Sequence, residues 1–308
     1  MTAAYTPRSE LMETLRRNLV PIVFLTPAAI VIFMFMAIPM ANSILLSFQS
    51  WNGMSPPRWV GFRNYTALFG DRIFLIALGN TVYFTVATVL LQTIIPLLVA
   101  NLLSSGIRGG VFFRTMYFMP VIISLAISGL LWAMIYEPNF GVLNEFLRSI
   151  GLGGMTRLWL ADRDTVMPSI ILVSVWQSLG FYLVIYFAAI QSIPSELYDA
   201  AKMDHANAFR RLWHVTVPML RPVIVLVIVL NTINGIKVFD QIWVMTAGGP
   251  NHASDTLGTY LYSTSFGAMG SANPQLGYAT AIAIVILILS ALLSIIQIRI
   301  GKRQEIEY

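Results

Sequence analysis

Long apolar runs separated by short polar segments dominate the pattern of this chain. Six runs stand out, at about residues 20–47, 76–103, 111–135, 167–190, 216–245 and 277–298. A helix needs about 20 apolar residues to cross the hydrocarbon layer of a bilayer, and each run is long enough. Because lipid offers the backbone no hydrogen-bonding partners, each run is expected to be one spanning helix. The pattern therefore predicts an all-α, polytopic membrane protein with six transmembrane helices.

The polar segments between the runs predict smaller elements. Residues 61–70 and 141–154 carry apolar side chains at mixed i, i+3 and i+4 spacings, which is typical of short helices lying on the membrane surface. The stretch TAGGPNHASDT, residues 246–256, is rich in Gly, Pro and Asn and predicts an external loop.

The composition agrees with a membrane protein. The chain is 57% hydrophobic and 11% charged, and its mean hydropathy is +0.73, which excludes an ordinary soluble globular protein. It has no cysteine, which excludes disulfides and cysteine metal sites, and its three histidines lack metal-ligand spacing, so no metal site is predicted. The net charge of +5 is expected to reflect cytoplasmic loops rather than nucleic-acid binding.

Six spans put both chain ends on one side of the membrane. With the N-terminus inside, twelve of the 19 Lys and Arg residues lie in inner segments, in agreement with the positive-inside rule. This orientation predicts residues 1–19 as a cytoplasmic segment, residues 20–300 as the membrane domain and residues 301–308 as a cytoplasmic tail. It also places residues 195–218 in the longest inner loop.

The chain lacks the sequence patterns of a nucleotide-binding or catalytic protein. The phosphate-binding pattern G-x-x-x-x-G-K-[ST] is absent, and no Ser–His–Asp or paired-carboxylate arrangement can be argued from the residues. We therefore expect no catalytic residues and no cofactor in this chain. If ATP drives its activity, the ATPase is a separate chain.

The segment Ser195–Pro218 holds a dense group of charged residues between two apolar runs. Ser195 is expected to cap a short helix, with Glu196 and Asp199 in its first turn, where negative charge suits the helix dipole. A break is expected near residues 204–206, followed by a second short helix. One face of this helix is expected to be apolar, with Phe209, Leu212 and Trp213. Another face is expected to be basic, with Arg210, Arg211 and His214. The prediction is a helix–turn–helix on the cytoplasmic surface, although an amphipathic loop lying on lipid headgroups fits the same pattern.

This segment resembles the EAA motif of permeases of ATP-binding cassette (ABC) importers, which runs E-A-A, three residues, G, nine residues and I-x-L-P. Here Asp199-Ala200-Ala201 stands for E-A-A and Val215-Thr216-Val217-Pro218 for I-x-L-P, at matching spacing. In that family the loop forms coupling helices that sit in a cleft of the ATPase. The resemblance implies that the ATPase contacts are Glu196, Asp199, Ala200, Ala201, Asp204, His205, Phe209, Arg210 and Pro218.

His205 departs from the motif, because it occupies the position of the glycine. Glycine would permit a positive φ in the turn, and a histidine in that conformation costs on the order of 1 kcal/mol. Two interpretations remain open at this stage, a pH-sensitive contact with the ATPase and a surface histidine in a relaxed turn.

The resemblance extends over nearly all of residues 20–300 and narrows to the carbohydrate-importer branch, the maltose-type and glycerol-phosphate-type permeases. The matching segments are WVGFRNYTALF, GNTVYFT, FFRTMYFMPVIIS, EPNFGVLNEFL, IPSELYDAAKMD and FDQIWVMTAGGP. The resemblance implies a type I ABC importer permease that moves a sugar or sugar derivative across the cytoplasmic membrane of a bacterium or archaeon. The implied partners are a second related permease, an ATPase dimer that holds ATP and Mg, an extracytoplasmic solute-binding protein and membrane lipid, with no nucleic acid.

The fifth apolar run is unusually polar for a membrane helix. Polar groups at membrane depth usually face a bundle interior or a water-filled path, and sugars pair their hydroxyls with planar amides and their apolar faces with aromatic rings. The expected pathway residues are Asn231, Asn234, Lys237, Phe239, Asp240, Gln241 and Trp243, with Gln177 from the fourth run. Hydrogen bonding at an interface between two permeases fits the same polarity, and Lys237 and Asp240 could form a neutralising i, i+3 pair.

Other functions remain as alternatives. A permease for a solute other than a carbohydrate would share the EAA motif. An ion-driven secondary transporter predicts mid-span carboxylates and internal repeats, and neither is visible in the sequence. A membrane scaffold without transport would not need the polarity of residues 231–241.

Overall fold

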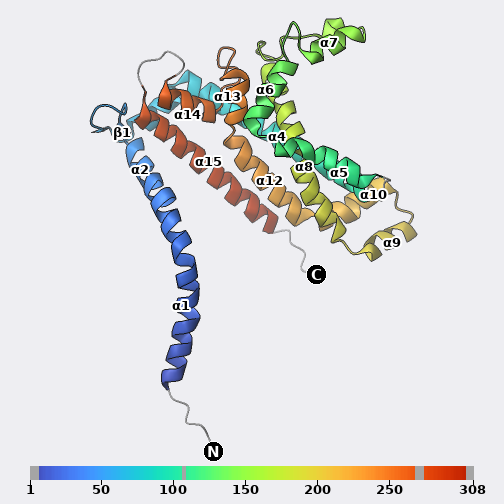
Figure 1. The fold of residues 1–308 in the computed structure, drawn as a ribbon, viewed down its shortest axis with the longest axis horizontal. Coiled ribbons are helices and arrows are strands. Elements are labelled where there is room, and N and C mark those ends of the chain that lie inside the picture. The colour runs from blue at the N-terminus through green and yellow to red at the C-terminus, as the bar shows by residue number, and fades with distance from the viewer. Residues whose placement is uncertain (1–6, 106–108, 268–273, 303–308) are drawn as a thin grey trace, which may run out of the picture.

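The computed structural model describes residues 7–105, 109–267 and 274–302. In these ranges, four helices are long and apolar enough to cross a membrane, and two bent pairs of helices raise the number to six. The predicted all-α membrane architecture is therefore confirmed (Figure 1), with six spans if each bent pair is one span. The cytoplasmic assignment of residues 1–19 and 301–308 falls in part outside the described residues and stays a prediction.

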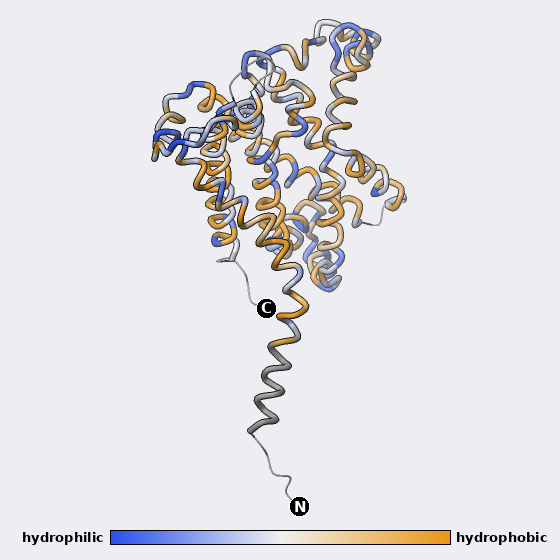
Figure 2. Tube along the Cα trace, turned by 60° about the vertical axis from the view of Figure 1, so that its left-hand side comes forward, coloured by the Kyte–Doolittle hydropathy of each residue, from blue (hydrophilic) through white to orange (hydrophobic). Residues whose placement is uncertain are grey.

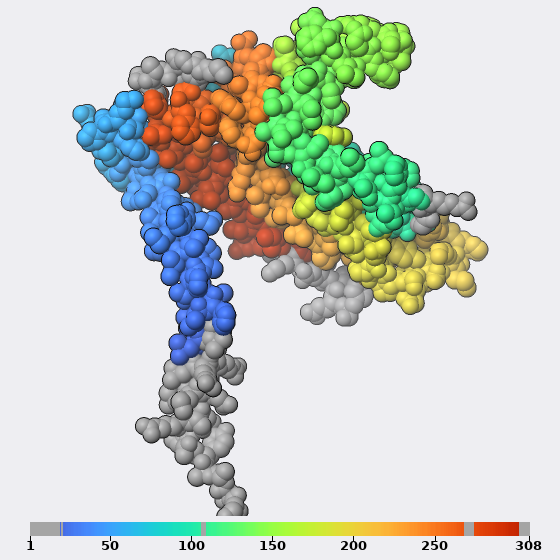
Figure 3. Space-filling model, in the orientation of Figure 1, coloured from blue at the N-terminus to red at the C-terminus, as the bar shows by residue number. Residues whose placement is uncertain are grey.

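The first span is a peripheral helix. Helix α1 (Pro7–Ile32) continues through the π-helical segment η1 (Phe33–Ala37) into α2 (Ile38–Ser47). The wide π turn ends two residues before Pro39, whose nitrogen carries no hydrogen and cannot complete an α-helical ladder. No side chain from residue 21 to residue 46 is buried, and Figures 1 and 3 show this helix standing apart from the bundle, with only its C-terminal end close to α15.

The bundle centre is built on α4 (Arg72–Ser104) and α8 (Val166–Gln191), which pack along each other and match two predicted runs. Helix α12 (Arg221–Ile236) also packs on α4, and the last helix, α15 (Leu276–Lys302), packs on α12. Gly235 allows the close approach of α12, because a Cβ there would lie 2.8 Å from Thr85 Oγ1. Figure 2 shows hydrophobic residues along the long helices and hydrophilic residues concentrated in the connecting segments.

The third predicted run is not one straight helix. It forms α5 (Gly110–Ile122) and α6 (Leu125–Ile135), which meet at an angle of 100°. Ser124 starts the second helix by accepting a hydrogen bond from Ile127 N at 3.3 Å. The expectation of a continuous helix over 111–135 was therefore wrong, because a local cap at Ser124 redirects the chain within an apolar run.

The fifth predicted run, 216–245, is also broken. It contains α11 (Val217–Met219), α12 and α13 (Asp240–Thr246), and α12 turns by 75° from the helical stretch that precedes it. Pro218 and Pro222 each stand in the first turn of a helix, where the missing N–H costs nothing. Residues 237–239 leave the helix next to a polar cavity, which is where irregular backbone is tolerated at membrane depth.

Short elements form the two ends of the bundle. At one end lie the antiparallel pair β1 (Gln49–Ser50) and β2 (Arg58–Trp59), together with α3 (Arg63–Gly70), α7 (Val142–Ser149), the 3₁₀ turn η2 (Gly153–Met155), α13 and α14 (Leu257–Phe266). The short helices predicted within 61–70 and 141–154 are confirmed, whereas α14 was not predicted. Helices α9 (Ser195–Met203) and α10 (Ala208–Arg211) lie at the opposite end (Figure 1).

Candidate functional site

A central cavity of about 360 Å³ lies where α12 ends and α13 begins, against α4, α8 and the junction of α5 and α6. Among the predicted pathway residues, those that line it are Gln177, Asn231, Asn234, Lys237, Phe239, Asp240 and Gln241. Trp243 is not part of the lining. Its ring stacks behind Phe239, with centroids 5.9 Å apart, and against Tyr262 at 4.6 Å.

The wall of the central cavity holds buried amide atoms that lack hydrogen-bond partners within the described parts of the chain. Both side-chain polar atoms of Asn231 are unpaired, as are Nε2 of Gln241 and Oε1 of Gln177. Asn231 is 1% exposed and Gln241 is 2% exposed. Buried polar groups are normally paired, since an unpaired one costs roughly 1–3 kcal/mol. Each of these atoms has less than 1 Å² of accessible surface, so a water or ligand that both donates and accepts hydrogen bonds would pair with them only after a shift of the cavity wall.

Gln177 links this wall to the break in the third span. Its Nε2 donates to the carbonyl oxygen of Ile123 at 2.8 Å, directly between α5 and α6. Gly180, one turn further along α8, lets α5 come close, since a Cβ there would lie 2.1 Å from Tyr117 O. The bend of the third span is thus fastened to α8 beside the cavity.

Two charged residues complete the lining. Lys237 and Asp240 are exposed, and the described residues contain no ion pair between them. The i, i+3 pair suggested by the spacing does not form, because residues 237–239 are not helical. Both charges remain available to a ligand or a partner.

Several lining residues were missed by the sequence analysis. They are Phe84, Thr88 and Gln92 of α4, and Ser174, Ser178 and Tyr182 of α8. Gln92 had a detectable signal, because it is an amide in the middle of an apolar run. It donates to Ser174 Oγ at 3.2 Å and so ties α4 to α8 at the cavity. The hydroxyl residues had little signal, since serine and threonine often bond their own helix.

At the other end of the bundle, a left-handed residue follows the C-cap of α9. His205 has φ of 55°, the conformation that the motif glycine would favour. Ala206 N donates to Ala201 O at 2.9 Å, and His205 N donates to Lys202 O at 3.0 Å. This is the hydrogen-bond pattern of a Schellman motif. The break expected near residues 204–206 is confirmed, and the turn has kept its shape despite the histidine.

The second helix of this pair is capped by a residue that the sequence analysis did not select. Asn207 Oδ1 accepts from Arg210 N at 2.8 Å, and α10 continues through the π-helical segment η3 (Leu212–Thr216) into α11. The Tyr198 hydroxyl and Thr216 Oγ1 lie 3.0 Å apart and tie α9 to η3. We call residues 195–219 the coupling pair.

Two details predicted for the start of α9 were wrong. Ser195 is the first helical residue and makes no capping hydrogen bond, because Pro194 takes the cap position with φ of −55° and ψ of 133°. Glu196 lies in the first turn, whereas Asp199 lies one turn later and pairs with Lys202 at 2.8 Å.

The coupling pair lies at one tip of the bundle (Figure 1) and exposes apolar side chains there. Met203 is 82% exposed, Phe209 68% and Trp213 53%, and the last two rings lie 6.1 Å apart. Leu212, expected on the same face, is instead buried. Of the predicted ATPase contacts, the exposed ones are Glu196, Asp199, Ala200, Asp204, His205, Phe209 and Arg210, and the partly exposed ones are Ala201 and Pro218.

About two thirds of this chain matches a known transport family. Residues 96–306 match the model of the binding-protein-dependent transport system inner membrane component. The chain belongs to this family.

The inner membrane component has relatives that cover most of its length. It is 38% identical over 290 residues to the probable ABC transporter permease protein YurN of Bacillus subtilis, covering 93% of this chain and 97% of the relative. It is 35% identical over 272 residues to the diacetylchitobiose uptake system permease protein NgcF of Streptomyces coelicolor, covering 84% and 75%.

A solved structure shares the fold of the inner membrane component. The crystal structure of a bacterial alginate ABC transporter in complex with an alginate pentasaccharide-bound periplasmic protein contains a chain that matches with a TM-score of 0.83. Identity is 23%, and the match covers 95% of this chain and 97% of that one.

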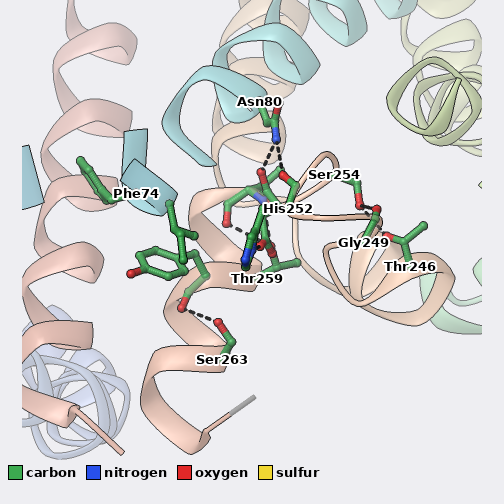
Figure 4. A network of polar contacts seen from close by, with 12 residues as sticks. Phe74, Asn80, Thr246, Gly249, His252, Ser254, Thr259 and Ser263 are labelled. Carbon is green, nitrogen blue, oxygen red and sulfur yellow. Dashed lines mark hydrogen bonds and ion pairs between the residues drawn. The ribbon is translucent and has the colours of Figure 1, made fainter. Parts of the chain in front are cut away.

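The loop over residues 247–256 is held by a hydrogen-bond network (Figure 4). Asn80 Nδ2 donates to the carbonyl oxygens of His252 and Asp255, at 3.2 and 2.9 Å. His252 Nδ1 lies 2.5 Å from Asp255 Oδ2, and Thr259 Oγ1 donates to Asp255 Oδ1 at 2.9 Å. The predicted loop over 246–256 is confirmed from Ala247 onward, and the network fixes it to α4.

Proposed function

We propose that this chain is the transmembrane subunit of an ATP-driven importer that moves a sugar or sugar derivative across the cytoplasmic membrane. The central cavity carries the proposal. Its unpaired donors and acceptors, on Asn231, Gln241 and Gln177, match hydroxyl groups, which both donate and accept. Phe239 adds a ring against which an apolar sugar face can pack. The saccharide named for NgcF supports the same class of substrate.

The cavity in this chain would be one part of a longer path. We infer that a second, related permease completes the path. Lys237 and Asp240 would help to select the solute, because neither charge is neutralised by the other. An extracytoplasmic binding protein would deliver the solute at the end that carries α7 and α14. That end lies opposite the coupling pair. The start of α1 and the end of α15 point away from it, which supports cytoplasmic chain termini (Figure 1).

The coupling pair would bind the ATPase dimer, which holds ATP and Mg. Helix α10 runs through η3 and α11 to α12, and α12 ends in the cavity wall at residues 231–236. A movement of the pair therefore reaches Asn231 through a single continuous stretch of chain. Closure of the ATPase dimer would favour one orientation of this stretch and shift the population between inward-open and outward-open states.

Reconstitution tests this function directly. The chain would be placed in nanodiscs with its second permease, ATPase and binding protein, and ATP hydrolysis would be measured over a panel of saccharides, alditols, glycerol phosphate, amino acids and peptides. We expect one class of saccharide to stimulate hydrolysis several-fold. Equal rates with every carbohydrate, or stimulation by an amino acid or a peptide, would refute the sugar assignment. Failure of the ATPase to co-purify with the chain would refute the ATP-driven mechanism.

A further inference from the structure

A second polar cavity opens at the outer end of the bundle. It has a volume of about 650 Å³ and lies among β1, α3, the start of α4, α14 and α15. A neighbouring cavity of about 350 Å³ shares Ser50, Asn64, Gln275 and Tyr278 with it. The two are therefore lobes of one depression, the outer groove. None of its lining residues lines the central cavity.

Helix α14 separates the outer groove from the central cavity. Tyr260, Ser263 and Thr264 line the groove. Tyr262 packs the other way, with its ring 5.0 Å from that of Phe239 in the central cavity wall. The network around Asp255 anchors the start of α14 to α4 (Figure 4). The groove is thus a separate site with a fixed wall.

Asp71 is the acidic residue in the groove lining, and its oxygens are already engaged. It accepts hydrogen bonds from the hydroxyls of Tyr260 and Tyr278, and from the amides of Ile73 and Phe74. Burial raises the pKa of Asp71, but these hydrogen bonds outweigh burial and hold the pKa below its ordinary value. Asp71 therefore organises the two tyrosines as walls and is not free to pair with the arginines of the groove.

Two arginines line the groove without a carboxylate partner among the described residues. Arg63 lines the larger lobe and Arg58 the smaller one. Neither forms an ion pair with any residue in the described ranges. An arginine guanidinium matches a carboxylate in a planar, two-bond geometry, so each lobe offers a position for an acidic group.

We propose that the outer groove binds an acidic saccharide. The carboxylate of one sugar unit pairs with Arg63, and a second acidic unit reaches Arg58. The sugar rings lie against Tyr260 and Tyr278, which present aromatic surface, and against Trp51 in the smaller lobe. The volume of each lobe lies within the usual range of small-molecule sites, roughly 300–1,000 Å³. This site is independent of the solute carried through the central cavity.

The test uses the full chain in lipid nanodiscs without ATP, with trigalacturonate as the probe and its fully methyl-esterified form as the uncharged twin. Isothermal titration calorimetry measures both. We expect the acid to bind about 10- to 100-fold more tightly than the ester, as one or two charge-assisted hydrogen bonds would give. Arg63→Gln should weaken binding of the acid by a similar factor, and Arg63→Lys by less.

The matched control is Arg72→Gln, which removes an outer arginine that does not line the groove and should leave binding unchanged. Equal affinity for acid and ester, measured on the unmodified chain, would overturn the proposal even if Arg63→Gln failed to fold. Loss of binding in Lys237→Gln with no change in Arg63→Gln would place the acid in the central cavity and would also overturn it.

Discussion

The central cavity and the coupling pair both arise from polar segments of an apolar chain, yet the groups left without partners differ between them. In the cavity, the amides of Asn231 and Gln241 are buried with unpaired atoms. In the coupling pair, polar groups such as Asn207 bond within the pair, whereas the rings of Phe209 and Trp213 are exposed.

The difference shows what each region lacks. The cavity lacks hydrogen bonds, which a hydroxyl-rich small molecule supplies. The coupling pair exposes aromatic rings of the kind that protein interfaces bury, since interfaces gain most from a few buried aromatic residues. Polar residues in the sequence marked both regions. Only the structure shows that one region leaves polar atoms without hydrogen bonds and the other leaves apolar rings exposed.

The largest effect is expected from Phe209→Glu. A charge in the centre of the exposed apolar surface should lower co-purification of the ATPase at least tenfold, since central aromatic residues of interfaces contribute about 2 kcal/mol or more. Phe140→Glu is the matched control, because Phe140 is 74% exposed but does not belong to the coupling pair. Unchanged ATPase recovery with Phe209→Glu would remove the basis for calling this surface a docking site.

The next effect concerns the cavity. Asn231→Leu should weaken saccharide stimulation of ATP hydrolysis about 5- to 100-fold, if two hydrogen bonds to the solute are lost. The melting temperature should stay equal or rise, because two buried unpaired atoms disappear.

Thr232→Val provides the contrast for Asn231→Leu. It removes the hydrogen bond that Thr232 Oγ1 accepts from Gln297 Nε2 at 2.8 Å, so it should lower the melting temperature and spare stimulation. If Asn231→Leu instead lowered the melting temperature and spared transport, the amide would serve an interface between helices or permeases.

A smaller effect is expected at the contact that holds the cavity wall. In Gly235→Ala the new Cβ would lie 2.8 Å from Thr85 Oγ1 and 3.0 Å from Thr85 Cα. Such overpacking costs about 1–3 kcal/mol and should lower the melting temperature. Gly79→Ala in α4 meets no heavy atom within 4 Å and should be neutral or stabilising. Equal melting temperatures for the two variants would show that α12 moves away from α4 freely.

The smallest effect is expected from His205→Gly. Glycine removes the strain of a positive φ, so the free energy of unfolding should rise by about 1 kcal/mol. Coupled ATP hydrolysis should be retained. His205→Ala keeps the strain and removes the imidazole, so it separates conformation from chemistry. Loss of coupled hydrolysis in both variants would assign a contact to the imidazole.

The sequence located the spans but not their breaks. Hydropathy records which residues avoid water, and the residues around Ser124 are as apolar as those of a straight helix. The break at residues 237–239 was marked by polarity, but polarity does not give the direction of the backbone. Helix α14 carries mixed polar and apolar residues, and much of its support is tertiary, including the bond from Leu257 N to Thr81 Oγ1 at 2.9 Å.

Only part of the lining of the central cavity could be predicted from the sequence. The amides of the fifth run stood out because they lie at membrane depth, and most of the residues chosen there line the cavity. Gln177 of α8 was predicted, but the other lining residues of α4 and α8 were missed, in part because serines and threonines also occur as ordinary helix residues. Trp243 was chosen for its chemistry, which does not reveal that Phe239 lies between it and the cavity.

The π-helical segment Leu212–Thr216 sets an angle between the two regions. An α-helical residue advances the chain by about 100° around the helix axis, and a π turn absorbs one extra residue. Because the π turn absorbs the extra residue, deleting one residue from this segment would restore regular α-helix and leave Phe209 facing nearly the same way relative to α12. A one-residue insertion or deletion that no π turn absorbed would instead rotate Phe209 by about 100° relative to α12, and would misdirect this exposed ring even though every other side chain was unchanged.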